Sequence, residues 1–93
     1  MAKYSVELFG MSNMLADLRN VEVELDNEVS LRDVVIALRE KMPALEGRVI
    51  APGEDTLASH CSFNVNGRFH IEDYDVKVQP GDHILVVTLA LGG

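Results

Sequence analysis

Apolar and polar residues alternate along two segments near the start of the chain, residues 3–9 and residues 21–25. The apolar members are Tyr4, Val6, Leu8, Val21, Val23 and Leu25. A period of two is typical of a strand that buries one face, so we predict a strand in each segment. Residues 11–20 do not alternate and are predicted to form a loop, in which a helical turn would carry Met14, Leu15 and Leu18 inward.

After residue 30 the apolar positions change to a helical period. They are Leu31, Val34, Val35, Leu38 and Met42, which form one stripe on a helix. Ser30 suits the N-cap, and Asp33, three residues later, completes a start that resembles a capping box. Because Pro43 cannot continue a helix, we expect the helix to end near Lys41 or Met42.

The second half of the chain contains three further predicted strands. Residues 44–59 show no regular period, and residues 52–55 (Pro-Gly-Glu-Asp) mark a loop. Segments 63–65 and 68–71 flank Asn66-Gly67, the dipeptide that best fits a type I′ hairpin turn. An acidic loop (72–75) and a turn (79–82) follow. Residues 83–89 are apolar at nearly every position, so this last strand is expected in the middle of a sheet with both faces covered.

The order of these segments predicts the architecture. Two strands, a helix and three strands, with a central final strand, indicate an α+β fold of the β-grasp type: a mixed sheet covered on one face by one main helix. A first hairpin, a crossover helix on one face and a final strand parallel to the first would satisfy both faces and the right-handed crossover rule. The chain has 93 residues, enough for one domain and too few for two. We therefore expect a single domain over residues 1–93, with a flexible tail over about residues 90–93.

The excess of acidic over basic residues indicates which kinds of partner the chain can bind. Eight Lys and Arg residues stand against fifteen Asp and Glu residues, a net charge of −7. Nucleic-acid binding depends on clustered Lys and Arg, so we expect no nucleic-acid partner and favour a basic protein partner. No segment approaches the roughly 18 apolar residues that a membrane span needs, and no apolar leader follows the first residues. Together with the single cysteine, these features predict a cytoplasmic protein without membrane contact.

The metal-ligating residue types do not form a pattern that predicts a metal site. His60 and Cys61 are adjacent, and His70 and His83 follow at spacings unlike those of zinc sites. Adjacent residues on a strand point to opposite faces, which also argues against a catalytic cysteine–histidine pair. We therefore predict no metal site and interpret Cys61 as a small buried or edge residue.

Two glycines, Gly92 and Gly93, follow the last predicted strand. With the β-grasp pattern, this end resembles the sulfur-carrier proteins of the ubiquitin-like superfamily, such as the small subunit of molybdopterin synthase and the sulfur carrier of thiamine biosynthesis. The other matching pieces are residues 6–9, 21–25, the helix from Ser30, residues 63–67 and the Gly81-Asp82 turn. The chain departs from the molybdopterin-type carriers at residues 88–91 (Thr-Leu-Ala-Leu). Those carriers usually contain a proline just before the two glycines. The apolar residues of this chain are closer to the apolar lead-in of ubiquitin.

The resemblance implies a function for Gly93. In this family an E1-like enzyme joins the terminal carboxylate to the α-phosphate of ATP, and a persulfide sulfur then displaces AMP to leave a thiocarboxylate. The thiocarboxylate donates sulfur in cofactor (molybdopterin), metabolite or tRNA biosynthesis. The implied partners are the E1-like adenylating enzyme and a sulfur-accepting synthase subunit or sulfurtransferase. The carrier would hold no catalytic residue and bind no cofactor, since the partner enzyme consumes the ATP.

Parity along the last strand predicts a docking surface. Ile84 and Val86 should point to the helix, whereas Leu85, Val87, Leu89 and Leu91 should lie on the other side as an apolar patch for partner enzymes. The long loops could instead cover this face.

Two other functions fit the same sequence. One is a ubiquitin-like modifier that is conjugated to lysines through the same terminus, a reading that the apolar lead-in without proline favours. The other is a non-covalent β-grasp interaction module in which the terminal glycines are incidental.

Overall fold

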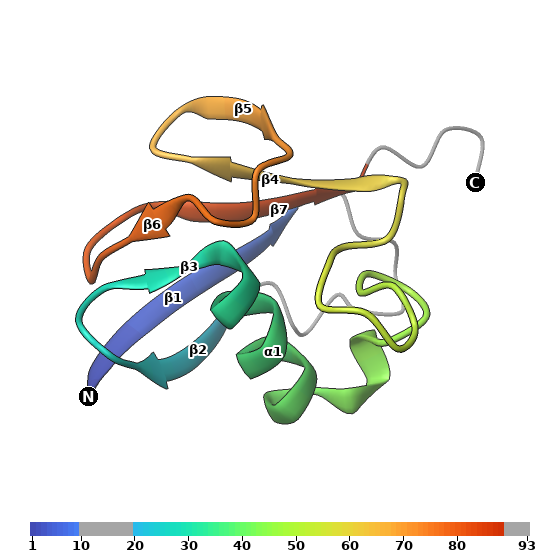
Figure 1. Ribbon diagram of the computed structural model, residues 1–93, viewed down its shortest axis with the longest axis horizontal. Helices are drawn as coiled ribbons and strands as arrows, with labels where there is room; N and C mark the ends of the chain where they lie inside the picture. The colour runs from blue at the N-terminus through green and yellow to red at the C-terminus, as the bar shows by residue number, and fades with distance from the viewer. Residues whose placement is uncertain (10–19, 89–93) are drawn as a thin grey trace.

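The computed structural model describes residues 1–9 and 20–88, and its centre is a five-stranded sheet (Figure 1). The strands lie in the order β2-β1-β7-β4-β5. Their bounds are β1 Ala2–Phe9, β2 Asn20–Leu25, β4 Cys61–Val65, β5 Arg68–Ile71 and β7 Ile84–Thr88. The predicted mixed sheet with one main helix is confirmed, and so is the β-grasp order of its elements.

The last strand is central, as its continuous apolar sequence predicts. β7 pairs parallel with β1, with Val6 opposite Ile84 and Phe9 opposite Val87. On its other side β7 pairs antiparallel with β4. β1 and β2 form the first antiparallel pair, and β2 begins at Asn20, one residue earlier than predicted. Parallel pairing of the first and last strands brings their ends, Phe9 and Thr88, to the same end of the sheet (Figure 1).

One helix, α1 (Leu31–Lys41), covers one face of the sheet (Figure 1). The Ser30 hydroxyl accepts the Asp33 N–H, and the Asp33 carboxylate accepts the Ser30 N–H, so the capping box is complete. The four buried helix residues are Leu31, Val34, Val35 and Leu38. The helix ends at Lys41, before a 3-10 turn that begins with Pro43 (η2, Pro43–Leu45).

A second, two-stranded sheet lies beside the start of α1 and was not predicted. β3 (Val29–Ser30) pairs antiparallel with β6 (Lys77–Val78). The first two helix N–H groups, those of Leu31 and Arg32, donate to the carbonyls of Val76 and Tyr74 at 3.0 Å. The segment just before β6 therefore satisfies donors that the helix cannot satisfy itself.

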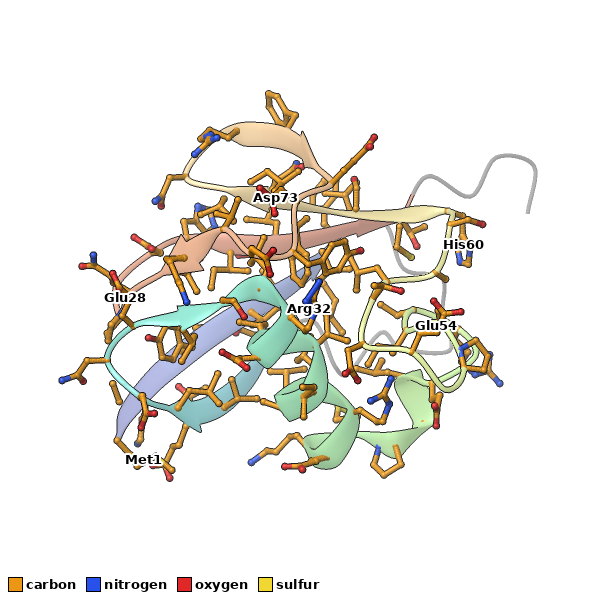
Figure 2. The ribbon with its side chains drawn as sticks, in the orientation of Figure 1. Met1, Glu28, Arg32, Glu54, His60 and Asp73 are labelled. Carbon is orange, nitrogen blue, oxygen red and sulfur yellow. The ribbon has the colours of Figure 1, made fainter. Side chains whose placement is uncertain are left out.

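The irregular segment 44–60 contributes more to the core than its sequence suggests. Its buried members are Leu45, Val49, Ile50 and Leu57. Arg39 of α1 holds this segment, because its guanidinium forms an ion pair with Asp55 at 2.9 Å and donates to the Glu54 carbonyl. Figure 2 labels Glu54 on this loop.

The predicted turns are present. Asn66 and Gly67 both have positive φ, 51° and 86°, as a type I′ hairpin turn requires. Gly81 has φ 96°, and the Asp82 N–H donates to the Gln79 carbonyl across the second turn at 3.0 Å. The expected helical turn with Met14, Leu15 and Leu18, and the expected flexible tail over 90–93, lie outside the described residues.

Candidate functional site

The candidate site is the end of the sheet from which the C-terminal segment leaves. Gly92 and Gly93 lie outside the described residues, which end at Thr88. At this end Phe9 of β1 pairs with Val87, and Cys61 of β4 pairs with Thr88. Figure 1 shows the ends of β1 and β7 and the start of β4 together at this side of the molecule. The C-terminal segment therefore follows β7, the central strand of the sheet, which is paired with a strand on each side.

The predicted alternation along β7 is confirmed for its described residues. Ile84 and Val86 are fully buried, whereas Leu85 and Val87 are half-buried. Since Val6 and Leu8 of β1 are buried opposite Ile84 and Val86, the buried set faces α1 and the half-buried set lies on the other face. We call that other face the open face. Leu89 and Leu91, the other two predicted docking residues, lie outside the described residues.

Phe9 adds a third apolar residue to this surface. It pairs with Val87, and its side chain is 58% exposed. We call Phe9, Leu85 and Val87 the exit patch. The prediction of docking residues did not include Phe9, although the period of two in residues 3–9 places it on the same side as Ser5 and Glu7. An exposed aromatic residue beside two half-buried aliphatic ones is a surface suited to a protein partner.

Polar residues border the exit patch on both sides. On β4, Ser62 lies opposite Val87 and Asn64 opposite Leu85. On β1, Glu7 lies opposite Leu85, and its carboxylate is 3.4 Å from Nε2 of His83. Further along the open face, Glu22 and Glu24 of β2 are exposed. The apolar patch therefore has an acidic side, which fits the expectation of a basic partner.

Cys61 lies next to the exit but is not exposed there. It is 8% exposed, and its Sγ is 3.3 Å from the Thr88 hydroxyl. Burial raises the pKa of the thiol, while the Thr88 hydroxyl lowers it to a smaller extent. The thiol is therefore protonated at neutral pH and is a poor nucleophile. This confirms its interpretation as a small buried residue.

The histidine side chains that the structure describes have separate partners. His60 Nε2 is 2.9 Å from the Arg48 carbonyl, and His83 faces Glu7. Within residues 1–9 and 20–88, no three His, Cys, Asp or Glu side chains gather as metal ligands. No helix in the same part of the chain is long and apolar enough to cross a membrane.

The acidic loop 72–75 has three exposed acidic residues and one aromatic residue that points inward. Glu72, Asp73 and Asp75 are exposed, and Asp75 forms a surface ion pair with Arg32 at 3.4 Å. Tyr74 instead points inward: its hydroxyl accepts the Leu57 N–H at 2.9 Å, and its ring meets Phe63 edge to face. The loop is thus a solvated segment anchored by one aromatic residue.

Comparison with known proteins supports the fold assignment. No family model matches the chain, and no curated protein matches its sequence significantly. Among solved structures, the chain is similar to small archaeal modifier protein 1 from Haloferax volcanii, with a TM-score of 0.78 and 26% identity over 99% of this chain and 100% of that one. It is also similar to the protein of the same name from Methanosarcina acetivorans, with a TM-score of 0.68, 23% identity and coverages of 100% and 98%.

A third similar structure carries another description. It is a putative molybdopterin converting factor, subunit 1, from Pyrococcus furiosus, with a TM-score of 0.67 and 20% identity over 97% of this chain and all of that one. The chain therefore has the ubiquitin-like β-grasp fold. The resemblance to small ubiquitin-like carriers that the sequence indicated is confirmed by its structural neighbours.

Proposed function

We propose that this protein is a ubiquitin-like carrier whose terminal carboxylate, on Gly93, is activated by an E1-like enzyme and converted to a thiocarboxylate. The observation that carries the proposal is the position of Thr88, the last described residue before the C-terminal segment. It ends the central strand β7, directly after Val87 of the exit patch, in which Phe9 is exposed and Leu85 and Val87 are half-buried. An enzyme that binds this patch is positioned to receive Gly92 and Gly93. The 26% identity to small archaeal modifier protein 1 over almost all of both chains supports the same class of protein.

The chemistry requires activation because a carboxylate is a poor electrophile. The Gly93 carboxylate attacks the α-phosphate of ATP, which releases pyrophosphate and leaves an acyl adenylate. The terminal sulfur of an enzyme persulfide attacks the acyl carbon and displaces AMP, which gives an acyl disulfide. A second enzyme thiol then attacks the sulfur that is bound to the enzyme. The products are the Gly93 thiocarboxylate and an enzyme disulfide, so the persulfide is the oxidised sulfur source and the thiol is the reductant.

The carrier itself contributes no catalytic residue in this proposal. Its one cysteine is buried with a raised thiol pKa, so the sulfur comes from the partner. ATP is bound and consumed by the E1-like enzyme. The carrier supplies the tail, the exit patch and an acidic surface that attracts a basic partner. A sulfur-accepting synthase subunit or sulfurtransferase would bind the loaded carrier and take the sulfur in cofactor, metabolite or tRNA biosynthesis.

The test is the intact mass of the full chain after incubation with its E1-like enzyme, ATP and a persulfide donor. We expect a mass increase that corresponds to replacement of one oxygen by sulfur. The variant without Gly93 should keep its circular dichroism spectrum and melting curve but gain no mass. An equal gain in that variant would contradict the proposal, because the sulfur would then be elsewhere.

A second candidate function is conjugation to other proteins, and the description of the Haloferax volcanii neighbour as a modifier favours it. Here an enzyme cysteine takes the acyl group from the adenylate as a thioester, and a lysine amine of the target then displaces the thiol. The same incubation distinguishes the two functions. Lysine adducts that depend on ATP and Gly93, detected as Gly-Gly remnants after digestion, indicate a modifier. Neither product, with an enzyme known to activate its carrier, would indicate a non-covalent interaction module.

A further inference from the structure

The turn between β4 and β5 contains a reactive dipeptide that the proposed carrier function does not use. Asn66 is the only asparagine of the chain that is followed by glycine, and Asn66 and Gly67 are both exposed. The backbone nitrogen after an asparagine can attack the carbonyl carbon of the asparagine side chain, and glycine hinders this attack least because it has no Cβ. Asparagine is accordingly among the thermolabile residues of proteins. Asn66 is therefore a candidate site for spontaneous deamidation.

The side chain of Asn66 is held by the turn that precedes β7. Its Oδ1 accepts the His83 N–H at 2.8 Å, and its Nδ2 donates to Oδ1 of Asp82 at 3.2 Å. The Asn66 N–H donates to the His83 carbonyl at 2.9 Å. The other carboxylate oxygen of Asp82 accepts the Gln79 N–H at 2.8 Å, so the acceptor is itself fixed. We call these hydrogen bonds of Asn66 to Asp82 and His83 the Asn66 clamp.

The folded turn also holds the two reacting groups apart. Ring closure needs the Gly67 nitrogen on the same side of the backbone as Cβ and Cγ of Asn66. Asn66, with φ 51°, is the first central residue of the type I′ turn. Such a residue has ψ of about 30°, which places the next nitrogen nearly opposite Cβ. The backbone must therefore rotate before the ring can close, and this rotation breaks the clamp. The folded chain should react only when this end of the sheet opens locally.

The products of deamidation cannot restore the clamp. In the open turn the Gly67 nitrogen attacks Cγ of Asn66 and loses its proton, the Cγ–Nδ2 bond breaks, and ammonia leaves. Water then opens the five-membered imide at either carbonyl, which gives aspartate or isoaspartate at position 66. Both products lack the Nδ2 donor and place a new carboxylate near that of Asp82, which repels it. Isoaspartate also adds a methylene group to the main chain of a two-residue turn.

We propose that Asn66 is a deamidation site protected by the Asn66 clamp, and that the reaction makes a transient opening of the clamp permanent. The affected region is the β4–β5 hairpin together with the start of β7, because Val65 pairs with both Arg68 and Ile84. Figure 1 shows the hairpin turn on the side of the molecule away from the end of β7. The reaction does not involve Gly93, so its test is separate from that of the carrier function.

The test compares the folded full chain with the same chain in guanidinium chloride, at one mildly alkaline pH and one temperature. Mass spectrometry of digested samples measures the fraction in which the Asn66 amide has become a carboxyl group. We expect the rate to be lower in the folded chain by roughly tenfold or more, because opening breaks the clamp hydrogen bonds. Equal rates would show that the clamp does not protect Asn66. The absence of reaction in both samples would show that Asn66 is not a deamidation site, and either result would overturn the proposal.

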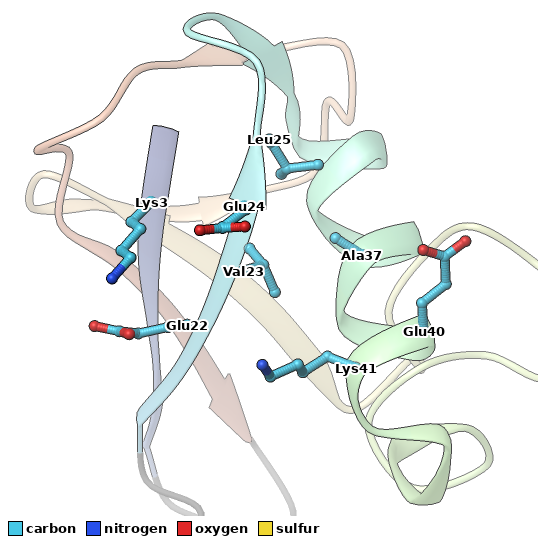
Figure 3. A pocket seen from close by; sticks show the side chains of 8 residues that line it. All are labelled: Lys3, Glu22, Val23, Glu24, Leu25, Ala37, Glu40 and Lys41. Carbon is cyan, nitrogen blue, oxygen red and sulfur yellow. The ribbon is translucent and has the colours of Figure 1, made fainter. Parts of the chain in front are cut away.

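Asn27 is a comparison site within the same chain. It is exposed in the turn after β2, beyond Leu25, which Figure 3 labels on that strand. The residue after it is Glu28, whose side chain hinders attack by the backbone nitrogen. We expect reaction at Asn66 of the denatured chain and much less at Asn27. Equal reaction at both asparagines would show unspecific alkaline damage and count against a site at the hairpin.

Asp82→Ala removes the carboxylate of the clamp. The rate at Asn66 in the folded chain should rise about tenfold, whereas the rate in the denatured chain should stay the same. The matched control, Asp73→Ala, removes the same charge and the acceptor of the Asp75 N–H from the acidic loop. It should change the folded-state rate less than about twofold. Equal increases in both variants would mean that charge or general destabilisation sets the rate, and the clamp would be excluded.

Hydrogen exchange separates local opening from global unfolding. In Asp82→Ala, the N–H groups of Asn66 and His83 should exchange faster, while those of β1 keep the wild-type rate. Asn66→Asp supplies the aspartate product and should show the same local pattern. Faster exchange throughout β1 in Asp82→Ala would show that the reaction follows global unfolding. Unchanged exchange in Asn66→Asp would show that the product can restore the clamp, and either outcome would contradict the proposal.

Discussion

Tyr4 shows how one side chain joins three parts of the fold. It lies in β1, is 2% exposed, and its hydroxyl donates to the Asp26 carbonyl at 2.6 Å. The same hydroxyl is 3.5 Å from the carbonyl of Val78 in β6. Burial raises the pKa of this phenol, and the negative charges of Asp82, Asp26 and Glu28 add to the effect. The hydroxyl therefore stabilises the fold only while it remains protonated.

Tyr4→Phe tests this role. We expect the free energy of unfolding to fall by about 1 kcal/mol near neutral pH, the usual net value of a hydrogen bond. Because the pKa of Tyr4 in the folded chain lies above the ordinary tyrosine value of about 10, the unfolded chain ionises first as the pH rises. The stabilisation is thus complete below about pH 10 and is lost above it.

Urea unfolding of both proteins at about pH 7 and about pH 11 measures the effect. The wild type should lose more stability than Tyr4→Phe between the two values. Cys61, whose thiol pKa is also raised, contributes equally to both proteins and cancels in the difference. Identical losses would mean that the Tyr4 hydroxyl does not control the alkaline decline.

Sequence patterns predict which way the Tyr4 side chain points, but not which groups its hydroxyl contacts. The period of two predicts correctly that its ring faces the core. Its hydrogen-bond acceptors lie 22 and 74 residues away in the chain. No local pattern could indicate these partners, because the β-grasp connection alone brings them to β1.

Among the elements, α1 has the clearest local signal, and its start can be tested. Ser30→Ala removes the hydroxyl that accepts the Asp33 N–H at 3.2 Å. Loss of an N-cap typically costs about 1 kcal/mol, which lowers the melting temperature of a domain this size by about 4–8 °C. Thermal melts followed by circular dichroism measure the change. Ser59→Ala, an exposed loop serine, is the matched control and should melt like the wild type.

The predicted elements differ in how strongly their sequences define them. The helix bounds, the Asn66-Gly67 hairpin and the central β7 follow from caps, turn chemistry and a continuous apolar run, and all three are confirmed. The β3–β6 pair was missed because two-residue strands are too short to show a period. The core residues of segment 44–60 were missed for a related reason: their side chains are positioned by Arg39 and by loop bonds rather than by a repeat.

At the scale of the whole molecule, the sheet order decides what the candidate site contains. Parity predicts that Leu85 and Val87 share a face, and the structure agrees. Phe9 joins them only because β1 and β7 are parallel neighbours with Phe9 opposite Val87. The sequence predicts that pairing, but the exposure of Phe9 depends on where β1 ends relative to β7. The exit patch is thus a property of the assembled sheet and not of one segment.

Phe9→Ala tests whether partner enzymes bind the exit patch. At 58% exposure, Phe9 contributes little to the core, so we expect the melting temperature to change only slightly. Exposed aromatic residues often dominate binding energy at interfaces. We therefore expect kcat/KM for ATP-dependent activation by the E1-like enzyme to fall about tenfold, mainly through a higher KM for the carrier.

Phe69→Ala is the matched control, since Phe69 is 72% exposed on the β5 hairpin, away from the tail exit. It removes the same aromatic group and should change kcat/KM less than twofold. A uniform loss in both variants would indicate a general effect of surface hydrophobicity, and no loss in Phe9→Ala would exclude the exit patch from the interface.

Raising the ionic strength should weaken activation of the wild type and of Phe9→Ala by the same factor, because Glu7, Glu22 and Glu24 are present in both. The apolar and the acidic parts of the open face would then contribute independently to partner binding.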